Sequence, residues 1–264
     1  MKNRRLTLTL GLILAALVLG LVALIASRVG QMEPEEVVLY ASTPEPTEPP
    51  PTPEPTPPPT PTPTPYVSPM DFDTLHGQNE HIVAWLEIPG TTVSYPVLQH
   101  PEDDTYYLNR TVDGTEGLPG SIFVFSGRVF SRFNTVLYGH NMADGSMFGS
   151  LKEYRDMDYL LGHRTVILYT PEAEYRYKIF ASTSFPDILI NAAYDDSSIA
   201  DRAAYLDKIY NDDSPEKVIV GDVEITSDDH IITLSTCVDS QPEQRRLVLA
   251  LLEHIEPEWR SIDG

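Results

Sequence analysis

This chain of 264 residues is poor in cysteine, tryptophan and basic side chains, with one Cys, two Trp and 18 Lys or Arg against 39 Asp or Glu. A single thiol cannot form an internal disulfide, so Cys237 is free for another role. The formal net charge of −21 makes nucleic acid a poor partner. The acidic pairs show no regular ligand spacing, so we expect no metal site and interpret these pairs as solvated loop residues.

Charge of either sign is absent from Leu6 to Ala26, directly after Lys2, Arg4 and Arg5. At about 1.5 Å per residue, such a run can cross the roughly 30 Å of a bilayer's hydrocarbon core. The basic residues before it predict a cytoplasmic N-terminus, residues 1–5, and an anchor over residues 6–27. A cleaved signal peptide is the alternative, but its apolar region would be shorter and would be followed by a clear Ala-x-Ala-like site.

Proline is concentrated in one segment, where residues 44–69 hold 14 of the 24 prolines in Pro-Thr and Pro-Glu repeats. Proline fixes φ and lacks a backbone donor, so this segment predicts an extended polyproline II spacer of about 3.1 Å per residue rather than a packed core. A ligand for proline-recognising domains is the competing interpretation. We favour an extracellular linker over residues 28–69 that carries the following domain.

Residues 70–264 are enough for one domain, and they carry 33 acidic against 14 basic side chains. Short β-rich runs separated by Pro-Gly and Asp-Gly turns recur along this region. Helical spacing is clearest from Ile199 to Tyr210, after the potential N-caps Ser197 and Ser198. Shorter helices are expected over residues 71–78 and 148–154. The pattern predicts a mainly β fold, an eight-stranded barrel with a helix between its sixth and seventh strands. The expected strands are residues 82–88, 92–97, 121–125, 135–139, 165–169, 174–182, 230–236 and 246–255.

The only cysteine closes an apolar, β-branched run, Thr233 to Cys237, and a second apolar run, Leu247 to Leu252, begins after Arg245 and Arg246. A thiolate is a strong nucleophile that needs a base or a positive neighbour at neutral pH, whereas a buried thiol is inert. The polar residues after Cys237 favour the reactive interpretation. Successive strand residues point to opposite faces, so one arginine can approach the thiol, but alternation does not decide which, because the run after them is apolar on both faces.

Among the seven histidines, His140 stands where a strand ends, after Val136-Leu137-Tyr138-Gly139 and before a loop. Side chains at a sheet rim are often functional, and histidine can donate and accept protons near neutral pH. Arginine cannot act as a base, so its useful role beside a thiol is to stabilise an oxyanion or to hold a carbonyl. These residue types predict cysteine-based acyl chemistry.

The segments Tyr138 to Met142 and Thr233 to Cys237, followed by an arginine and a Leu-Val-Leu-Ala strand, resemble the three signature elements of sortases and occur in the order of that family. Further segments resemble class B sortases across essentially the whole domain. They are Trp85 to Thr91, Tyr95 to Val97, Asp144 to Phe148, and the helix Ile199 to Tyr210.

The resemblance implies a membrane-anchored cysteine transpeptidase that cleaves a C-terminal sorting signal, LPxTG-like or a class B variant, after its Thr and transfers the acyl group to an amine. It implies Cys237 as nucleophile, His140 as general acid and then base, and Arg245, by its spacing, as the essential arginine. Ser235 and Thr236 would contact the substrate or the oxyanion. The implied partners are surface proteins or pilins bearing the signal, and a cell-wall precursor or pilin amine as acceptor. No cofactor is implied, and the catalytic domain would be extracellular.

One segment departs from the family pattern, because Phe125-Ser126-Gly127-Arg128 replaces the polar Asp-Tyr-Arg-like segment of many class B members. Two alternative functions remain open from the sequence. One is an extracellular cysteine peptidase, and the other is a catalytically inactive adhesion or sensor domain on a stalk. The sorting motif, the acceptor and the choice between wall anchoring and pilus polymerisation are not specified by these residues.

Overall fold

The computed structural model describes residues 66–127, 130, 132–211, 213–214, 216–238 and 241–257, which all belong to a unit spanning residues 61–264. Nine strands are present in this part: β1 (Ile82–Glu87), β2 (Ser94–Leu98), β3 (Ile122–Val124), β4 (Asn134–Tyr138), β5 (Thr165–Tyr169), β6 (Glu174–Pro186), β7 (Val218–Ile219), β8 (Ile231–Val238) and β9 (Gln241–Glu256). The helices are α2 (Phe72–Gln78), α3 (Met157–Gly162), α4 (Ile190–Ala193) and α5 (Ile199–Asn211), with 3₁₀ turns η1 (Tyr106–Asn109) and η2 (Gly149–Arg155).

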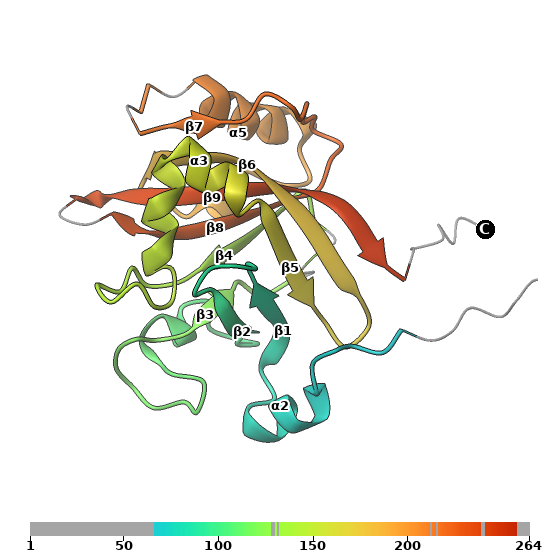
Figure 1. Ribbon diagram of the computed structural model, residues 1–264. Helices are drawn as coiled ribbons and strands as arrows, with labels where there is room; N and C mark the ends of the chain where they lie inside the picture. Colours follow the sequence, from blue (N-terminus) through green and yellow to red (C-terminus); the bar gives the residue numbers. More distant parts are fainter. Residues whose placement is uncertain are drawn as a thin grey trace, which may run out of the picture. The chain divides into compact units, whose positions relative to one another are not determined.

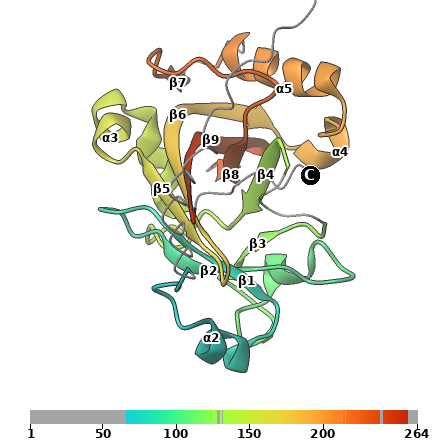
Figure 2. The ribbon, with the colours of Figure 1, turned by 90° about the vertical axis from the view of Figure 1, so that its right-hand side faces the viewer.

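Eight of these strands close into a barrel. The sheet order is β5-β1-β2-β3-β4-β8-β9-β6-β7, and β5 also pairs with β6, so the ring closes and only the two-residue β7 lies outside it. Most neighbours are antiparallel, but β2 pairs with β3 and β4 pairs with β8 in parallel. The predicted eight-stranded barrel is therefore confirmed. Helices α5 and α2 lie at opposite ends of it in both views (Figures 1 and 2).

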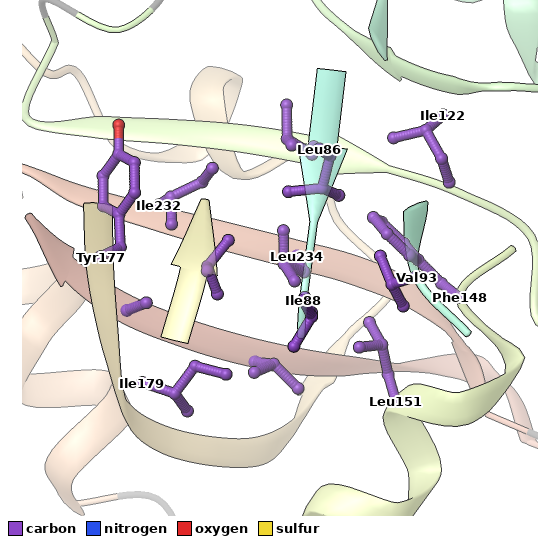
Figure 3. Close-up of a cluster of buried hydrophobic side chains, with 14 of the residues drawn as sticks. Leu86, Ile88, Val93, Ile122, Phe148, Leu151, Tyr177, Ile179, Ile232 and Leu234 are labelled. Carbon is purple, nitrogen blue, oxygen red and sulfur yellow. The ribbon is translucent and has the colours of Figure 1, made fainter. Parts of the chain in front are cut away.

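The central strands are apolar on both faces because each face is covered. Along β8, Ile232 and Leu234 enter the barrel core, whereas Ile231 belongs to a second cluster that also contains Tyr205 and Leu206 of α5. The residues of β9 alternate in the same way between the two clusters, which explains the continuous run Leu247 to Leu252. Figure 3 shows the barrel core, in which side chains from the strands meet Phe148 and Leu151 from the segment after His140.

Helix α5 begins where the sequence predicts it, because Ser198 Oγ accepts from the Asp201 backbone N–H at 3.2 Å as an N-cap. The helix is tied to the barrel by buried hydrogen bonds. Tyr205 Oη lies 3.1 Å from Thr233 Oγ1 of β8, and Thr233 Oγ1 donates to Asn134 Oδ1 of β4 at 2.8 Å. A satisfied buried network of this kind fixes the relative positions of its elements. The parallel strands β4 and β8 are thus held in one register before they reach their C-terminal ends.

Some predicted elements differ from those of the structure. The predicted helix over residues 148–154 is the 3₁₀ turn η2, and η1, α3 and α4 were not predicted. Strand β9 begins at Gln241 rather than Arg246, so both arginines lie inside a strand. The predicted anchor and most of the proline-rich linker lie outside the described residues. In the residues that the structure does describe, no helix is both long and apolar enough to cross a membrane.

Candidate active site

The parallel pairing of β4 with β8 brings His140 and Cys237 to neighbouring strand ends. Tyr138 of β4 lies opposite Ser235 of β8, and His140 and Cys237 each come two residues after this pair. The Gly139 N–H donates to the Ser235 carbonyl at 3.2 Å, and Thr236 Oγ1 donates to the Gly139 carbonyl at 2.7 Å. These bonds continue the pairing past the end of β4. Residues separated by 97 positions in sequence therefore line the same pocket.

Gly139 stands where there is no room for a side chain. A Cβ there would collide with Ile122 and would lie 2.8 Å from Phe148, closer than real Cβ contacts occur. Both of these residues are fully buried in the core (Figure 3). The close approach lets the chain leave β4 tightly against the barrel, which sets the position of the following His140.

Cys237 and Arg245 lie directly opposite each other on the antiparallel strands β8 and β9. Arg245 Nη1 donates to Cys237 Sγ at 2.7 Å, and both side chains are half-buried. Charge-assisted donors to an anionic acceptor are the strong class of hydrogen bond. The guanidinium is thus oriented to stabilise negative charge on the sulfur or on an oxygen bound beside it.

Arg246 points away from this site, as strand alternation requires. It is only 3% exposed and forms an ion pair with Glu216. Burial lowers the pKa of Arg246, and the Glu216 carboxylate opposes this shift. The pattern of residues left open which arginine meets the thiol, and the strand register places Arg245 there.

Asp187 is a member of the site that the sequence did not reveal. It follows the end of β6, where its N–H donates to the Glu243 carbonyl at 2.9 Å. Arg245 Nε donates to Asp187 Oδ1 at 2.7 Å, so the guanidinium bridges a carboxylate and the thiol. A planar guanidinium presents donors in fixed directions, so a bond at Nε orients the Nη donors. No local pattern marks this lone aspartate, because its partner is 58 positions away.

His140 is held through one ring nitrogen. Its Nε2 lies 2.7 Å from the Leu108 carbonyl, in the loop segment η1. A carbonyl oxygen can only accept, so Nε2 carries a proton in this arrangement. In the neutral ring the other nitrogen, Nδ1, is then the acceptor. Proton exchange with a substrate is therefore assigned to Nδ1.

One pocket contains the three candidate residues and has a largely apolar wall. Its lining residues are Thr105, Leu108, Phe123, Phe125, Tyr138, Gly139, His140, Asp187, Ile188, Leu189, Ser235, Cys237 and Arg245. Ile188 and Leu189 are 41% and 51% exposed, so this wall presents apolar surface to solvent beside Cys237. Burial raises the pKa of Tyr138 to about 12, so it is an uncharged phenol at neutral pH.

Ser235 and Thr236, the two other predicted site residues, point to opposite faces of β8. Ser235 lines the pocket on the same face of β8 as Cys237. The Thr236 hydroxyl faces the other way and is occupied by the Gly139 carbonyl, so only its backbone can serve the site. Among the described residues, no group of three or more His, Cys, Asp or Glu side chains could hold a metal ion. Arg128, from the segment that departs from the family pattern, lies outside the described residues.

Comparison with known proteins gives the family. A model of the sortase domain matches residues 86–253, a range that includes the strands bearing His140, Cys237 and Arg245. The chain belongs to the sortase family. Sortase B of Listeria monocytogenes is 35% identical over 176 residues, which cover 65% of this chain and 69% of the relative. Sortase B of Staphylococcus aureus is 30% identical over 189 residues, which cover 70% and 75%.

Solved structures agree with this assignment. The crystal structure of sortase B from Bacillus anthracis in complex with AAEK1 is 34% identical and has a TM-score of 0.60, covering 69% of this sortase and 83% of the solved chain. The Staphylococcus aureus sortase B–substrate complex is 29% identical with a TM-score of 0.60, covering 69% and 84%. The predicted class B assignment is therefore confirmed, and the protein is a sortase-type cysteine transpeptidase.

Proposed function

We propose that this sortase cleaves a C-terminal sorting signal, LPxTG-like or a class B variant, after its Thr and transfers the acyl group to an amine of the cell wall or of a pilin. The observation that carries this proposal is the 2.7 Å contact between Arg245 Nη1 and Cys237 Sγ, at the end of a strand paired with the one that leads into His140. The exposed Ile188 and Leu189 supply an apolar wall for the signal peptide.

The residues divide the chemistry between them. Cys237 Sγ attacks the Thr carbonyl carbon, a C–S bond forms, and the resulting oxyanion is stabilised by Arg245. The C–N bond then breaks, and His140 donates a proton to the leaving amine. In the second half, an acceptor amine attacks the thioester, His140 accepts its proton, and the sulfur leaves as a thiolate beside Arg245. Asp187 keeps the guanidinium aligned in both halves through its bond to Nε.

The proposal includes a cellular location. The uncharged run over residues 6–27 after three basic residues favours a single-pass membrane anchor with a cytoplasmic N-terminus. The proline-rich residues 28–69 would then carry the catalytic domain, residues 70–264, outside the cell. The same arrangement gives the enzyme access to surface proteins or pilins that bear the signal.

The decisive experiment is mass spectrometry of the full-length protein with LPxTG-like and NPxTN-like peptides, with and without added amines. We expect a thioester adduct on Cys237 that an amine converts into a ligated peptide. An adduct that only water releases, whatever the amine, would indicate a cysteine peptidase instead. No adduct from any peptide, together with a thiol that resists alkylation, would contradict catalysis and favour an inactive adhesion or sensor domain.

The neighbouring arginines provide a matched pair of variants. Arg245→Ala should lower kcat/KM by about 10² to 10³ because it removes the oxyanion donor, with little change in Tm. Arg246→Ala should do the reverse, because it removes a buried side chain together with its ion pair to Glu216, which then keeps only the exposed Arg155 as a partner. A loss of about 2 kcal/mol corresponds to a fall in Tm of roughly 4 to 8 °C with nearly unchanged kcat/KM. Equal loss of activity in both variants would contradict the assignment of Arg245.

A further inference from the structure

The turn η1 presents three successive carbonyls, and each of them accepts a hydrogen bond. The carbonyls of Tyr107 and Asn109 accept from backbone N–H groups of the segment before β3, at 3.1 and 2.8 Å. The Leu108 carbonyl between them lies 2.7 Å from His140 Nε2. The segment before β3 therefore holds η1 on both sides of the oxygen that orients the imidazole.

The side chain of Tyr107 anchors this turn to the rest of the domain. It is only 2% exposed and belongs to an apolar cluster that also contains Phe72 of α2 and Ile82 of β1. Its Oη lies 2.7 Å from His81 Nδ1 and accepts from Asn79 Nδ2 at 2.9 Å. Burial raises the pKa of Tyr107, so the phenol keeps its proton at neutral pH and can donate it to a hydrogen bond.

Asn79, the C-cap of α2, completes the hydrogen bonds around this hydroxyl. Its Nδ2 also donates to the Val112 carbonyl at 2.6 Å, and its Oδ1 accepts from the His81 N–H at 2.9 Å. The proton of the Tyr107 hydroxyl faces His81 Nδ1, the nearer of its two possible acceptors. A network in which every bond is made holds its members in one arrangement. The position of Tyr107 is therefore set by α2 and by the start of β1.

On its other side, the Leu108 carbonyl meets a chain segment that passes too closely for any side chain. A Cβ on Gly120 would collide with this oxygen and would lie 3.1 Å from His140 Cδ2. Gly120 has a φ of +67°, a conformation that glycine adopts readily. The oxygen that orients His140 thus has a backbone wall on one side and, on the other, a turn anchored by Tyr107.

We propose that Tyr107 is a positioning residue for His140 and acts through η1. Its hydroxyl network fixes the Leu108 carbonyl, which holds Nε2–H of His140 and leaves Nδ1 to exchange protons with the substrate. This assignment rests on the proposed transpeptidation and adds a residue to it. Without the anchor, the carbonyl shifts and the imidazole loses the bond that selects its orientation and tautomer. Protonation of the leaving amine then slows, whereas attack by the thiol does not.

The test compares two variants of the full-length protein that each lose one buried tyrosine hydroxyl. Tyr107→Phe keeps the ring and removes the bonds to His81 and Asn79. Tyr154→Phe is the matched control, because Tyr154 is 1% exposed and its hydroxyl donates to the His163 carbonyl at 2.8 Å, away from the pocket of Cys237.

Both variants are assayed with an LPxTG-like or NPxTN-like peptide that forms the thioester with the wild type, and with the p-nitrophenyl ester of its acyl part. The leaving group of the ester departs as an anion, so acylation from the ester needs no proton from His140. A spectrum of the protein labelled with ¹⁵N-histidine reports the tautomer of His140 independently of turnover, and its signal is identified by its loss in His140→Ala.

We expect Tyr107→Phe to lower kcat for amide cleavage by about five- to thirtyfold, because a small displacement of a catalytic group is costly. Its KM and its acylation from the ester should stay within about twofold of the wild type. Tyr154→Phe should lower Tm by a similar few degrees and leave both reactions unchanged. Neutral His140 should be a single Nε2–H tautomer in the wild type and in Tyr154→Phe, and a mixture of tautomers in Tyr107→Phe.

A second pair of variants acts on the same carbonyl from the opposite side. Gly120→Ala places a methyl group against the Leu108 carbonyl, so it should reproduce the loss that is specific to the amide. Gly114→Ala is its matched control, because Gly114 has a φ of +82° and a Cβ there would meet no atom within 4 Å. Both variants strain a backbone at positive φ, and only Gly120→Ala adds the contact.

Equal losses of the amide and ester reactions in Tyr107→Phe would overturn the assignment, because Tyr107 would then serve the fold or the attack by the thiol. Unchanged amide cleavage, or an unchanged tautomer of His140, would overturn it as well. In each case the wild type still forms the thioester, so the proposed function stands. Failure of the wild type to form a thioester with either class of peptide would instead reject the proposed function, and the tautomer comparison would still test Tyr107.

Discussion

Cys237→Ala is expected to abolish thioester formation, lowering signal-peptide cleavage by at least about 10⁴-fold, because no other cysteine exists in the chain to replace the nucleophile. The apolar wall of the pocket and Arg245 remain, so the variant should still bind the peptide. Rapid mixing with a fluorogenic signal peptide gives the rate, and fluorescence anisotropy with the same peptide gives its Kd. We expect the Kd to stay within a few-fold of the wild-type KM.

Two controls separate chemistry from folding. Cys237 is half-buried and lies at the end of β8, so its truncation should change Tm by no more than a few degrees. Cys237→Ser keeps the size of the side chain but replaces the thiol by a poorly ionised hydroxyl, and should be almost as inactive. Cleavage above about 1% of the wild-type rate in either variant would show that the thiol is not the nucleophile.

Much of the barrel could be predicted because its strands carry local signals. The strand β1 alternates buried Ile82, Ala84 and Leu86 with partly exposed neighbours, which is the pattern of a half-buried strand. Helix α5 has both a serine N-cap and apolar residues at helical spacing. The turn η2 has a similar pattern of apolar residues, but it forms 3₁₀ structure, since periodicity over seven residues does not distinguish the two.

The site was only partly predictable, because its geometry depends on pairings between distant segments. The sequence places His140 and Cys237 each at a strand end, but their proximity follows from the parallel register of β4 with β8. The same holds for Arg245 and Arg246, since a shift of one residue in β9 would exchange their faces. Asp187 has no local signal, because its partner Arg245 is 58 positions away and only the barrel brings the two together.

The strand register also explains how the reactive side chains can be solvent-accessible and still be held in place. Hydrogen bonds within the sheet and the buried Tyr205–Thr233–Asn134 network hold the two strands below the site. The reactive groups themselves are only half-buried, as they must be to meet a peptide and then an amine. Rigid strands thus carry accessible side chains, so the catalytic groups are already oriented before the substrate binds.

His140→Ala is expected to lower amide cleavage by about 10² to 10⁴-fold, because the leaving amine no longer receives a proton. An activated acyl donor, such as a p-nitrophenyl ester of the signal peptide, has a leaving group that departs as an anion. Acylation from this ester should therefore fall by less than about tenfold. The comparison of amide with ester, measured by release of each leaving group, isolates proton donation from attack by the thiol.

His254→Ala is the matched control, since His254 lies half-exposed near the end of β9 and pairs with Glu256 at 3.4 Å rather than with the site. It should cleave both substrates like the wild type. Loss of the ester reaction as large as that of the amide reaction in His140→Ala would mean that His140 activates the thiol instead of the leaving group.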